Sequence, residues 1–346
     1  MNRAATFALA PASLTYGLCV RLRNRLYRSG TLKTYDVGAP VISVGNLTTG
    51  GTGKTPLVKW LALQLTSGGK RVCVLTRGYR RNSSGRIVVS DNASALANVD
   101  EAGDEPFLLA HDLTGRAAVI CDANRVDAAE WAIKNLSSQA FILDDAFQHQ
   151  RIRRDFNILT VDATNPWGNR KLLPAGILRE PISQLTRADC IVITRADEVE
   201  TSRLRAEIES LAGKIPIFTS RMRLVETRSV SESEQTGSAD RQDPVAAFCG
   251  IGNPNSFFSL LRREGFKIVH ERSFRDHYRY TQADVDRLVN DATARGAKAM
   301  VTTAKDAVKL TDLKFGLPCF VIDVAIEIDQ EREFLNHVQQ AIEKRT

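Results

Sequence analysis

The sequence predicts an α/β fold with two parts, a larger sheet domain and a second, smaller α/β domain. Its 346 residues suffice for two domains of ordinary size. Short β-branched runs alternate with longer segments of helical spacing, which is typical of parallel sheets whose strands are joined by helices. The polar stretch 229–243 interrupts this alternation with almost no apolar residue, and it indicates a linker or exposed loop.

Each element is predicted from its own apolar run. In the first series, strands are expected at 41–44, 70–76, 117–121, from 140, at 156–161 and from 190, with helices at 57–65, 107–110 and 125–133. In the second series, strands are expected from 245 and at 267–270, 299–302 and 318–324, with helices at 256–263, 282–293 and 331–344. The expected parts are therefore an N-terminal helix at 1–33, the larger domain at 34–228, the linker at 229–243 and the smaller domain at 244–346.

Composition narrows the class of protein without choosing a function. Hydrophobic residues make up 43% of the chain and charged residues 25%, as in ordinary globular proteins. The net charge of +7 and the pI of about 9.2 fit an acidic partner, and nucleic acid, anionic lipid and a phosphorylated ligand all qualify. The six cysteines have no C-x-x-C spacing and lie mostly in apolar runs, which predicts small core residues in a reducing compartment and no metal site among them.

The N-terminal segment 1–33 combines an uncharged run with a basic cluster. The run 4–20 is short for a spanning helix, which needs about 20 residues, and most basic residues follow it, unlike those of a signal peptide. Leucines recur at four-residue spacing and arginines occupy another face: Leu14, Leu18, Leu22 and Leu26 against Arg21, Arg25 and Arg28. The pattern indicates a basic amphipathic helix in a membrane interface; the alternative is a helix that packs on its own domain.

The stretch 41–60 runs strand, glycine-rich loop, helix, which is the context of a phosphate-binding loop. Glycines let successive backbone N–H groups face one anion, and the helix N-terminus adds its positive end. The predicted nucleotide-binding residues are Thr48, Gly50, Gly51, Thr52, Gly53, Lys54 and Thr55. We expect Lys54 to reach the β- and γ-phosphates and the Thr55 hydroxyl to ligate Mg²⁺, which makes the larger domain P-loop NTPase-like.

One departure from the usual loop pattern is visible. Thr48 stands where a glycine is usual, and we expect Gly50 and Gly51 to supply the conformational freedom. The alternative interpretation of the whole stretch is a glycine-rich turn that binds nothing.

A second half of a nucleoside-triphosphate site follows the strand that starts at 140. This strand ends in Asp144 and Asp145, and such an end brings a carboxylate to the Mg²⁺ beside the phosphates. The sequence does not choose between the two acids. His149 is predicted to orient an acid or contact phosphate, and a hydrogen-bonded structural histidine is the alternative.

Further polar residues follow strand ends, where open α/β sheets bind ligands. The basic loop 77–81, with Arg77 and Tyr79, is either a substrate loop or a surface turn. Asp104 stands at the start of a helix, and taken alone it favours N-terminal capping.

The long loop between the strands at 156 and 190 is also a functional candidate, because long structured loops often carry function. Within it, Arg179 is a candidate for neutralising a transferring phosphate group. The following strand ends in Thr194-Arg-Ala-Asp197, which loosely resembles the guanine-reading Asn-Lys-x-Asp of GTPases and keeps a GTPase interpretation open.

Together these motifs resemble those of the tetraacyldisaccharide 4′-kinase family, the lipid A 4′-kinases of Gram-negative bacteria. The resemblance covers most of the chain and rests on Val44-Gly-Asn-Leu, Gly50-Gly-Thr-Gly-Lys-Thr-Pro56, Thr76-Arg-Gly-Tyr79, Gly103-Asp-Glu-Pro106, Leu143-Asp-Asp-Ala-Phe-Gln-His149, Leu172-Leu-Pro-Ala-Gly176, Leu178-Arg-Glu-Pro181, Asp276-His277 and Thr302-Thr-Ala-Lys-Asp306. The chain has Ala146 where the family often has glycine.

The resemblance implies a kinase that transfers the γ-phosphate of ATP to the 4′-hydroxyl of lipid A disaccharide 1-phosphate. It implies two α/β domains joined by a flexible connection, and a peripheral enzyme on the cytoplasmic face of the inner membrane. It assigns Asp104 as the catalytic acid, assisted by His277 from the second domain. It places Tyr79 and its arginine neighbours on the disaccharide and makes Arg179 and Glu180 an active-site pair.

The expected cofactors are ATP and Mg²⁺, and the expected partners are the lipid substrate and a membrane surface. We expect a monomer. We also expect no binding of nucleic acid, because the basic N-terminal residues accompany an apolar stripe and no helicase-like aromatic-basic run is present. The rival interpretations are a P-loop GTPase switch or metal-delivery protein and a nucleic-acid-binding ATPase.

Overall fold

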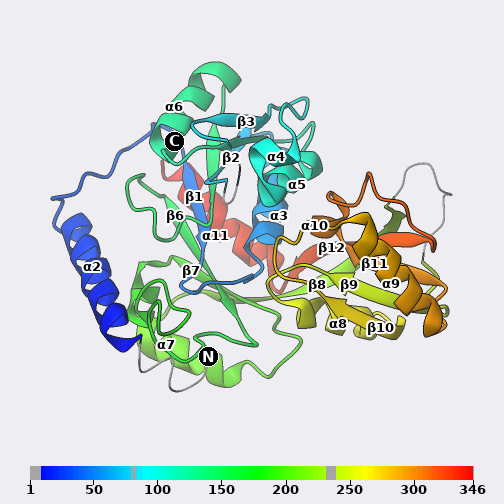
Figure 1. The fold of residues 1–346 in the computed structure, drawn as a ribbon. Coiled ribbons are helices and arrows are strands. Elements are labelled where there is room, and N and C mark those ends of the chain that lie inside the picture. Colours follow the sequence, from blue (N-terminus) through cyan, green and yellow to red (C-terminus); the bar gives the residue numbers. More distant parts are fainter. Residues whose placement is uncertain (1–8, 79–80, 82, 231–238, 346) are drawn as a thin grey trace. The chain divides into compact units, whose positions relative to one another are not determined.

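The computed structural model describes residues 9–78, 81, 83–230 and 239–345, which form two compact units. One unit comprises Met1–Arg221 with Glu327–Thr346, and the other comprises Met222–Ile326 (Figure 1). These bounds differ from the expected boundary at 229–243, and the closing helix belongs to the first unit instead of the second. The reason is that two long neighbouring strands, β8 (Ile217–Ser229) and β12 (Cys319–Ile328), carry the chain out of the first unit and back.

The first unit is built on a mostly parallel sheet in the order β8-β7-β6-β1-β5-β2-β4-β3. Its strands, besides β8, are β1 (Val41–Gly45), β2 (Val72–Thr76), β3 (Ile87–Ser90), β4 (Ala118–Cys121), β5 (Ala140–Asp144), β6 (Phe156–Asp162) and β7 (Cys190–Thr194). The central strands are buried along their whole length, as expected for parallel strands covered on both faces. β3 pairs antiparallel with β4. Val44 pairs with Asp144, so the phosphate loop and the two acids leave the same edge of the sheet.

Helices cover both faces of this sheet. They are α3 (Lys54–Ser67), α4 (Val99–Ala102), α5 (Asp104–Asp112), α6 (Arg125–Leu136), η1 (Ile182–Arg187), α7 (Ser202–Ala212) and α11 (Glu331–Glu343). On one face of the sheet, alternate residues of β2, β4 and β5 pack against α6. On the same face, alternate residues of β6 and β7 pack against α7. On the other face, α3 and α11 meet where the Trp60 and Phe334 rings lie 5.7 Å apart. Phe334 also packs edge-on against Phe218 of β8, and these contacts hold the closing helix in the first unit.

The second unit is a smaller parallel arrangement in the order β10-β9-β11-β12. It contains β9 (Pro244–Cys249), β10 (Lys267–Ser273) and β11 (Ala299–Thr303), with α8 (Pro254–Arg263), α9 (Gln282–Ala294) and α10 (Ala304–Ala307). Alternate residues of β9 face opposite sides: Val245 and Ala247 pack with the phenylalanines of α8, and Ala246 and Phe248 pack with α9. The predicted fold class, α/β with a smaller second α/β unit, is confirmed.

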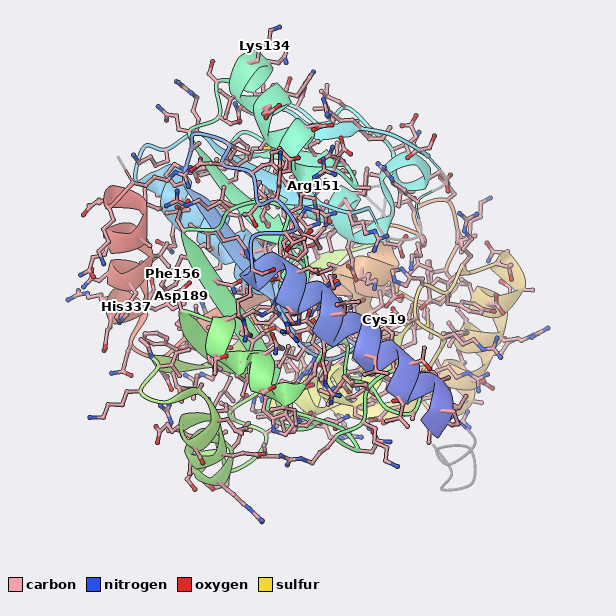
Figure 2. All side chains as sticks on the ribbon, turned by 90° about the vertical axis from the view of Figure 1, so that its left-hand side faces the viewer. Cys19, Lys134, Arg151, Phe156, Asp189 and His337 are labelled. Atoms are coloured by element: carbon pink, nitrogen blue, oxygen red, sulfur yellow. The ribbon has the colours of Figure 1, made fainter. Side chains whose placement is uncertain are left out.

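The N-terminal helix α2 (Ala10–Arg28) has an unusual distribution of its side chains. Gly17, Val20 and Asn24 are buried, whereas Leu14, Leu18 and Leu22 are 58–69% exposed. Figure 2 looks onto this helix, with Cys19 labelled on it. Within the described part of the chain, no helix has the length and apolarity needed to cross a membrane.

Candidate active site

The glycine-rich loop lies between β1 and α3, as predicted. Gly50 (φ 112°) and Gly53 (φ 74°) both adopt the left-handed backbone that other residues rarely take, and Gly53 directly precedes α3. Thr48, in place of the usual glycine, is buried and bridges to Leu178, and its hydroxyl accepts a hydrogen bond from Asn46 Nδ2 at 3.3 Å. The loop thus obtains its freedom from Gly50 and uses Thr48 as an anchor.

Side chains of the neighbouring strands β6 and β7, and of the residue after β7, fix the phosphate loop by hydrogen bonds. Thr52 Oγ1 lies 3.0 Å from Thr160 Oγ1, and Thr194 Oγ1 donates to the Thr52 carbonyl at 3.1 Å. Arg195 Nη2 donates to the Gly51 carbonyl at 2.8 Å. Thr194 and Arg195, considered above as part of a guanine-reading motif, therefore contact the phosphate loop.

Asp145 lies between two cations at the carboxyl end of β5. Lys54 Nζ is 3.4 Å from Asp145 Oδ1, and Arg179 Nη1 donates to Asp145 Oδ2 at 2.8 Å. Burial alone would raise the pKa of Asp145, but Lys54 and Arg179 outweigh it and hold the pKa below its ordinary value. A cation pair around one ionised carboxylate is therefore assembled at the phosphate loop.

Asp144, the preceding residue, is buried and faces a different environment. Burial first, then the negative charges of Asp145 and Glu105, raise its pKa to about 7. Thr76 Oγ1 donates to Oδ2 at 3.4 Å, whereas Oδ1 has no hydrogen-bond partner among the described residues. A buried carboxylate oxygen without a donor is a site where a cation would be stabilised.

This chemistry fits Mg²⁺, which prefers oxygen ligands and is usually shared between a few protein groups and substrate phosphates. Asp144, Asp145 and the Thr55 hydroxyl at the start of α3 are the oxygen donors available. No group of three or more His, Cys, Asp or Glu side chains in the described ranges could hold a metal by itself. A shared ion is the arrangement that these residues suit.

Arg125 belongs to this edge of the sheet and was not predicted. It is the first residue of α6, it is only 3% exposed, and its charge interacts with Asp144 and Asp145. Its Nε has no hydrogen-bond partner within the described residues. The rule that ligands bind at strand ends would have pointed to it, because it follows β4 closely.

His149 lies near the same edge and is electrically neutral at pH 7. Burial first, then the charges of Arg125, Arg154, Arg151 and Arg77, lower its pKa to about 4. Its Nε2 is buried and has no hydrogen-bond partner among the described residues. His149 can therefore offer a neutral ring nitrogen, but no positive charge.

Asp104 is the first residue of α5, and Gly103 occupies the capping position before it. The carbonyl of Ala102 lies 3.9 Å from Cys121 Sγ, which places this helix start beside the carboxyl end of β4. Arg77 follows β2 at the same sheet edge, and Tyr79 lies outside the described residues.

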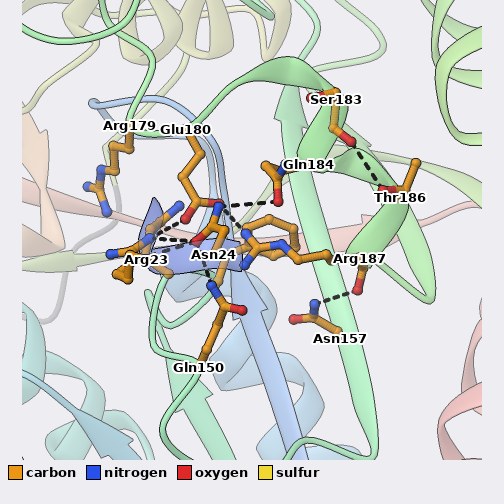
Figure 3. Close-up of polar contacts among 12 residues, drawn as sticks. Arg23, Asn24, Gln150, Asn157, Arg179, Glu180, Ser183, Gln184, Thr186 and Arg187 are labelled. Atoms are coloured by element: carbon orange, nitrogen blue, oxygen red, sulfur yellow. Dashed lines mark hydrogen bonds and ion pairs between the residues drawn. The ribbon is translucent and has the colours of Figure 1, made fainter. Parts of the chain in front are cut away.

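Glu180 follows Arg179 but is fully buried. Arg23 of α2 and Arg187 of η1 each donate to one of its two carboxylate oxygens (Figure 3). Both oxygens are thus engaged inside the protein.

His277 lies in the second unit, in the loop after β10, with φ 62°. Its amide donates to the Gly250 carbonyl at 3.3 Å, and Lys305 Nζ lies 3.0 Å from Asp276 Oδ1 and 3.5 Å from His277 Nε2. The buried Asp306 accepts from the Gly250 amide at 3.0 Å. The motifs at 276–277 and 302–306 therefore meet at one sheet edge within this unit.

Comparisons with known proteins show the family of this chain. A family model described as Tetraacyldisaccharide-1-P 4'-kinase matches residues 5–343. A Tetraacyldisaccharide 4'-kinase from Geobacter metallireducens is 42% identical over 319 residues, which are 90% of this chain and 90% of the relative. One from Halothermothrix orenii is 38% identical over 326 residues, which are 90% of this chain and 84% of the relative.

A solved structure is similar over nearly the whole length. It is the crystal structure of the "apo" form of LpxK from Aquifex aeolicus in complex with ATP, with a TM-score of 0.77 and 33% identity, covering 98% of this chain and 99% of that one. The family model, the relatives and this structure each span most of the chain. The protein therefore belongs to the tetraacyldisaccharide-1-phosphate 4′-kinase family.

Proposed function

We propose that the protein transfers the γ-phosphate of ATP to the 4′-hydroxyl of lipid A disaccharide 1-phosphate. The observation that carries the proposal is the joint contact of Lys54 and Arg179 with Asp145, beside a phosphate loop, in a chain of this family. The ATP complex of the Aquifex aeolicus relative supports ATP as the donor. Thr194 and Arg195 bind the phosphate loop itself and so do not serve as a guanine-reading motif. The GTPase alternative is therefore without support.

The loop from Thr48 to Thr55 would bind the phosphates through its backbone amides and the positive end of α3. Thr55, Asp144 and Asp145 would hold Mg²⁺, which, when bound, neutralises phosphate charge and orients the oxygens. Lys54 and Arg179 would stabilise the negative charge on the transferring group. Arg125, buried at the same edge, would add a fixed positive charge.

The sugar hydroxyl must lose a proton as it attacks, and Asp104 is the proposed acceptor. Asp104 is the first residue of α5, at the carboxyl-end edge of the sheet where the phosphate loop also lies. His277 is the proposed assistant of Asp104, on the strength of the family resemblance.

Arg77, Tyr79 and His149 are proposed to contact the disaccharide. Arg77 would supply charge, whereas the neutral His149 would supply a hydrogen bond.

The helix α2 is proposed to lie on the cytoplasmic face of the inner membrane. Its exposed Leu14, Leu18 and Leu22 would enter the apolar boundary of the bilayer, and exposed arginines such as Arg21 and Arg25 would meet anionic headgroups. A water-facing leucine stripe is costly unless another surface covers it, and acyl chains of substrate and bilayer match it. We propose a monomer of three functional parts: this helix, the kinase unit and the smaller α/β unit.

The test is phosphate transfer from radiolabelled ATP to lipid A disaccharide 1-phosphate in detergent micelles, for the wild type and Asp104→Asn. We expect a phosphorylated lipid from the wild type and a loss of kcat of at least roughly 100-fold in the variant. Unchanged transfer in Asp104→Asn would exclude that residue as the base. Absence of lipid product, with GTP hydrolysed in preference to ATP, would refute the kinase assignment.

A further inference from the structure

The helix α2 is attached to the kinase unit mainly through one loop. Ser13 Oγ donates to the Leu172 carbonyl at 2.8 Å, and Tyr16 Oη donates to the Arg179 carbonyl at 2.9 Å. At Gly17 the helix lies so close to this loop that a Cβ would be 2.8 Å from Leu172 Cδ1. The face of α2 that meets the protein therefore contains Gly17, Val20 and Asn24. Leu14, Leu18 and Leu22 face outward.

A buried charged cluster continues this attachment at Glu180. Its carboxylate is fully buried and is neutralised by Arg23 of α2 on one oxygen and Arg187 of η1 on the other. The guanidinium of Arg187 also stacks over the Phe147 ring at 4.4 Å, next to the acids of β5. Removing one partner of a buried ion pair leaves an uncompensated charge, so this arrangement tolerates little displacement.

Amides surround the cluster and add orientation. Asn24 of α2 is buried, its Nδ2 donates to Gln184 Oε1 at 3.2 Å, and its Oδ1 accepts from Gln150 Nε2 at 2.7 Å (Figure 3). The helix is thus fixed in rotation as well as in position.

The residue that precedes Glu180 faces the phosphate site. Arg179 donates through its side chain to Asp145, and its amide donates to the Leu47 carbonyl at 2.7 Å, just before the phosphate loop. The side chains of these two neighbouring residues therefore make contacts in different places, Arg179 at the phosphate site and Glu180 at α2.

We propose that Glu180 is a positioning residue for phosphate transfer. Paired with Arg23 and Arg187, it holds the backbone from which Arg179 reaches Asp145, and it makes the seating of α2 a condition for that placement. The inference rests on the proposed kinase function and replaces a direct contact of Glu180 with substrate. The Glu180 carboxylate is 0% exposed and is paired with two arginines inside the protein, so a sugar does not reach it. Small displacements of a charge-stabilising group such as Arg179, in contrast, reduce rates strongly.

The test compares Glu180→Gln and Arg23→Met, each alone and combined with Arg179→Met, in the micellar kinase assay. Arg170→Met is the matched control, because Arg170 lies on the same loop but pairs with Glu207 of α7. The measurements are kcat, KM for ATP, the melting temperature and flotation with anionic vesicles.

We expect Glu180→Gln to lower kcat by roughly 10- to 100-fold with KM for ATP unchanged, and to change kcat by less than about twofold in the Arg179→Met background. Arg23→Met should also lower kcat by roughly 10- to 100-fold, and this loss should disappear in the Arg179→Met background. The Arg23→Met protein should still float with vesicles. Arg170→Met should behave as the wild type.

Equal losses in both backgrounds would overturn the proposal, since Glu180 would then act without Arg179. If Glu180→Gln and Arg23→Met keep the wild-type kcat in an enzyme that does phosphorylate the lipid, the positioning role of Glu180 is overturned and the proposed kinase function stands. Failure of the wild type to form any phosphorylated lipid would overturn the proposed function and this inference with it.

Discussion

Arg195 links the phosphate loop to the buried carboxylate of Asp162. Its replacement by methionine, alone and with Asp162→Asn, distinguishes its effect on stability from its effect on nucleotide binding. One guanidinium nitrogen pairs with Asp162 and the other donates to the Gly51 carbonyl at 2.8 Å. The two paired side chains are only 12% and 10% exposed. Breaking a buried ion pair costs about 3–5 kcal/mol, because the remaining charge stays uncompensated.

The loss of stability in Arg195→Met should lie at the lower end of that range of energies. Thr164 continues to donate to Asp162 Oδ1, through its amide at 3.0 Å and its hydroxyl at 2.7 Å. A loss of about 3 kcal/mol in a unit of this size lowers the melting temperature by roughly 6–12 °C. The second substitution Asp162→Asn removes the stranded charge, so Arg195→Met/Asp162→Asn should regain most of that loss.

Nucleotide binding should not recover in the double variant. The Gly51 carbonyl has lost a charged donor worth about 1.5–3 kcal/mol, which corresponds to a rise in KM for ATP of roughly 10- to 100-fold in both variants. Thermal melting and ATP kinetics on the same samples provide the assay. A melting temperature of Arg195→Met within about 2 °C of the wild type would contradict this prediction, and so would a double variant that regains both stability and KM.

Two further predictions concern His149 and the leucines of α2. Because the folded-state pKa of His149, about 4, lies below its unfolded value of about 6.5, the unfolded chain takes up the proton first as pH falls. Stability should therefore be complete above pH 6.5 and decline by roughly 2–3 kcal/mol toward pH 4, and urea unfolding of His149→Gln should lack this part of the decline. Replacing Leu14, Leu18 and Leu22 by serine should leave the melting temperature within about 2 °C, since these side chains are exposed, but reduce vesicle binding at least roughly 100-fold; unchanged flotation would contradict the membrane role of α2.

The order of strands and helices was predictable because each element carries its own apolar run. The strands that begin at Val41, Ala140 and Cys190 are buried along their length, and such runs are visible without tertiary information. The strand β8 and the helix α7 were not predicted. Much of the surface of β8 is exposed and its apolar residues are scattered, whereas α7 does carry apolar residues at helical spacing, Leu204, Ile208 and Leu211, which could have revealed it. The domain boundary was displaced for the same reason, since β8 continues to Ser229 without a sharp change in composition.

By itself the sequence determined the phosphate loop, the acids at 144–145 and the kinase family, because local motifs encode local backbone and strand-end chemistry. Only the tertiary structure decided which groups surround Asp145, that Arg125 is buried beside it, and that Arg195 holds the loop. Glu180 shows this difference most clearly. The family resemblance makes it part of an active-site pair, whereas its burial against Arg23 and Arg187 depends on residues 157 positions before it and 7 after it. Burial and pairing depend on which distant segments meet, and no local pattern contains that information.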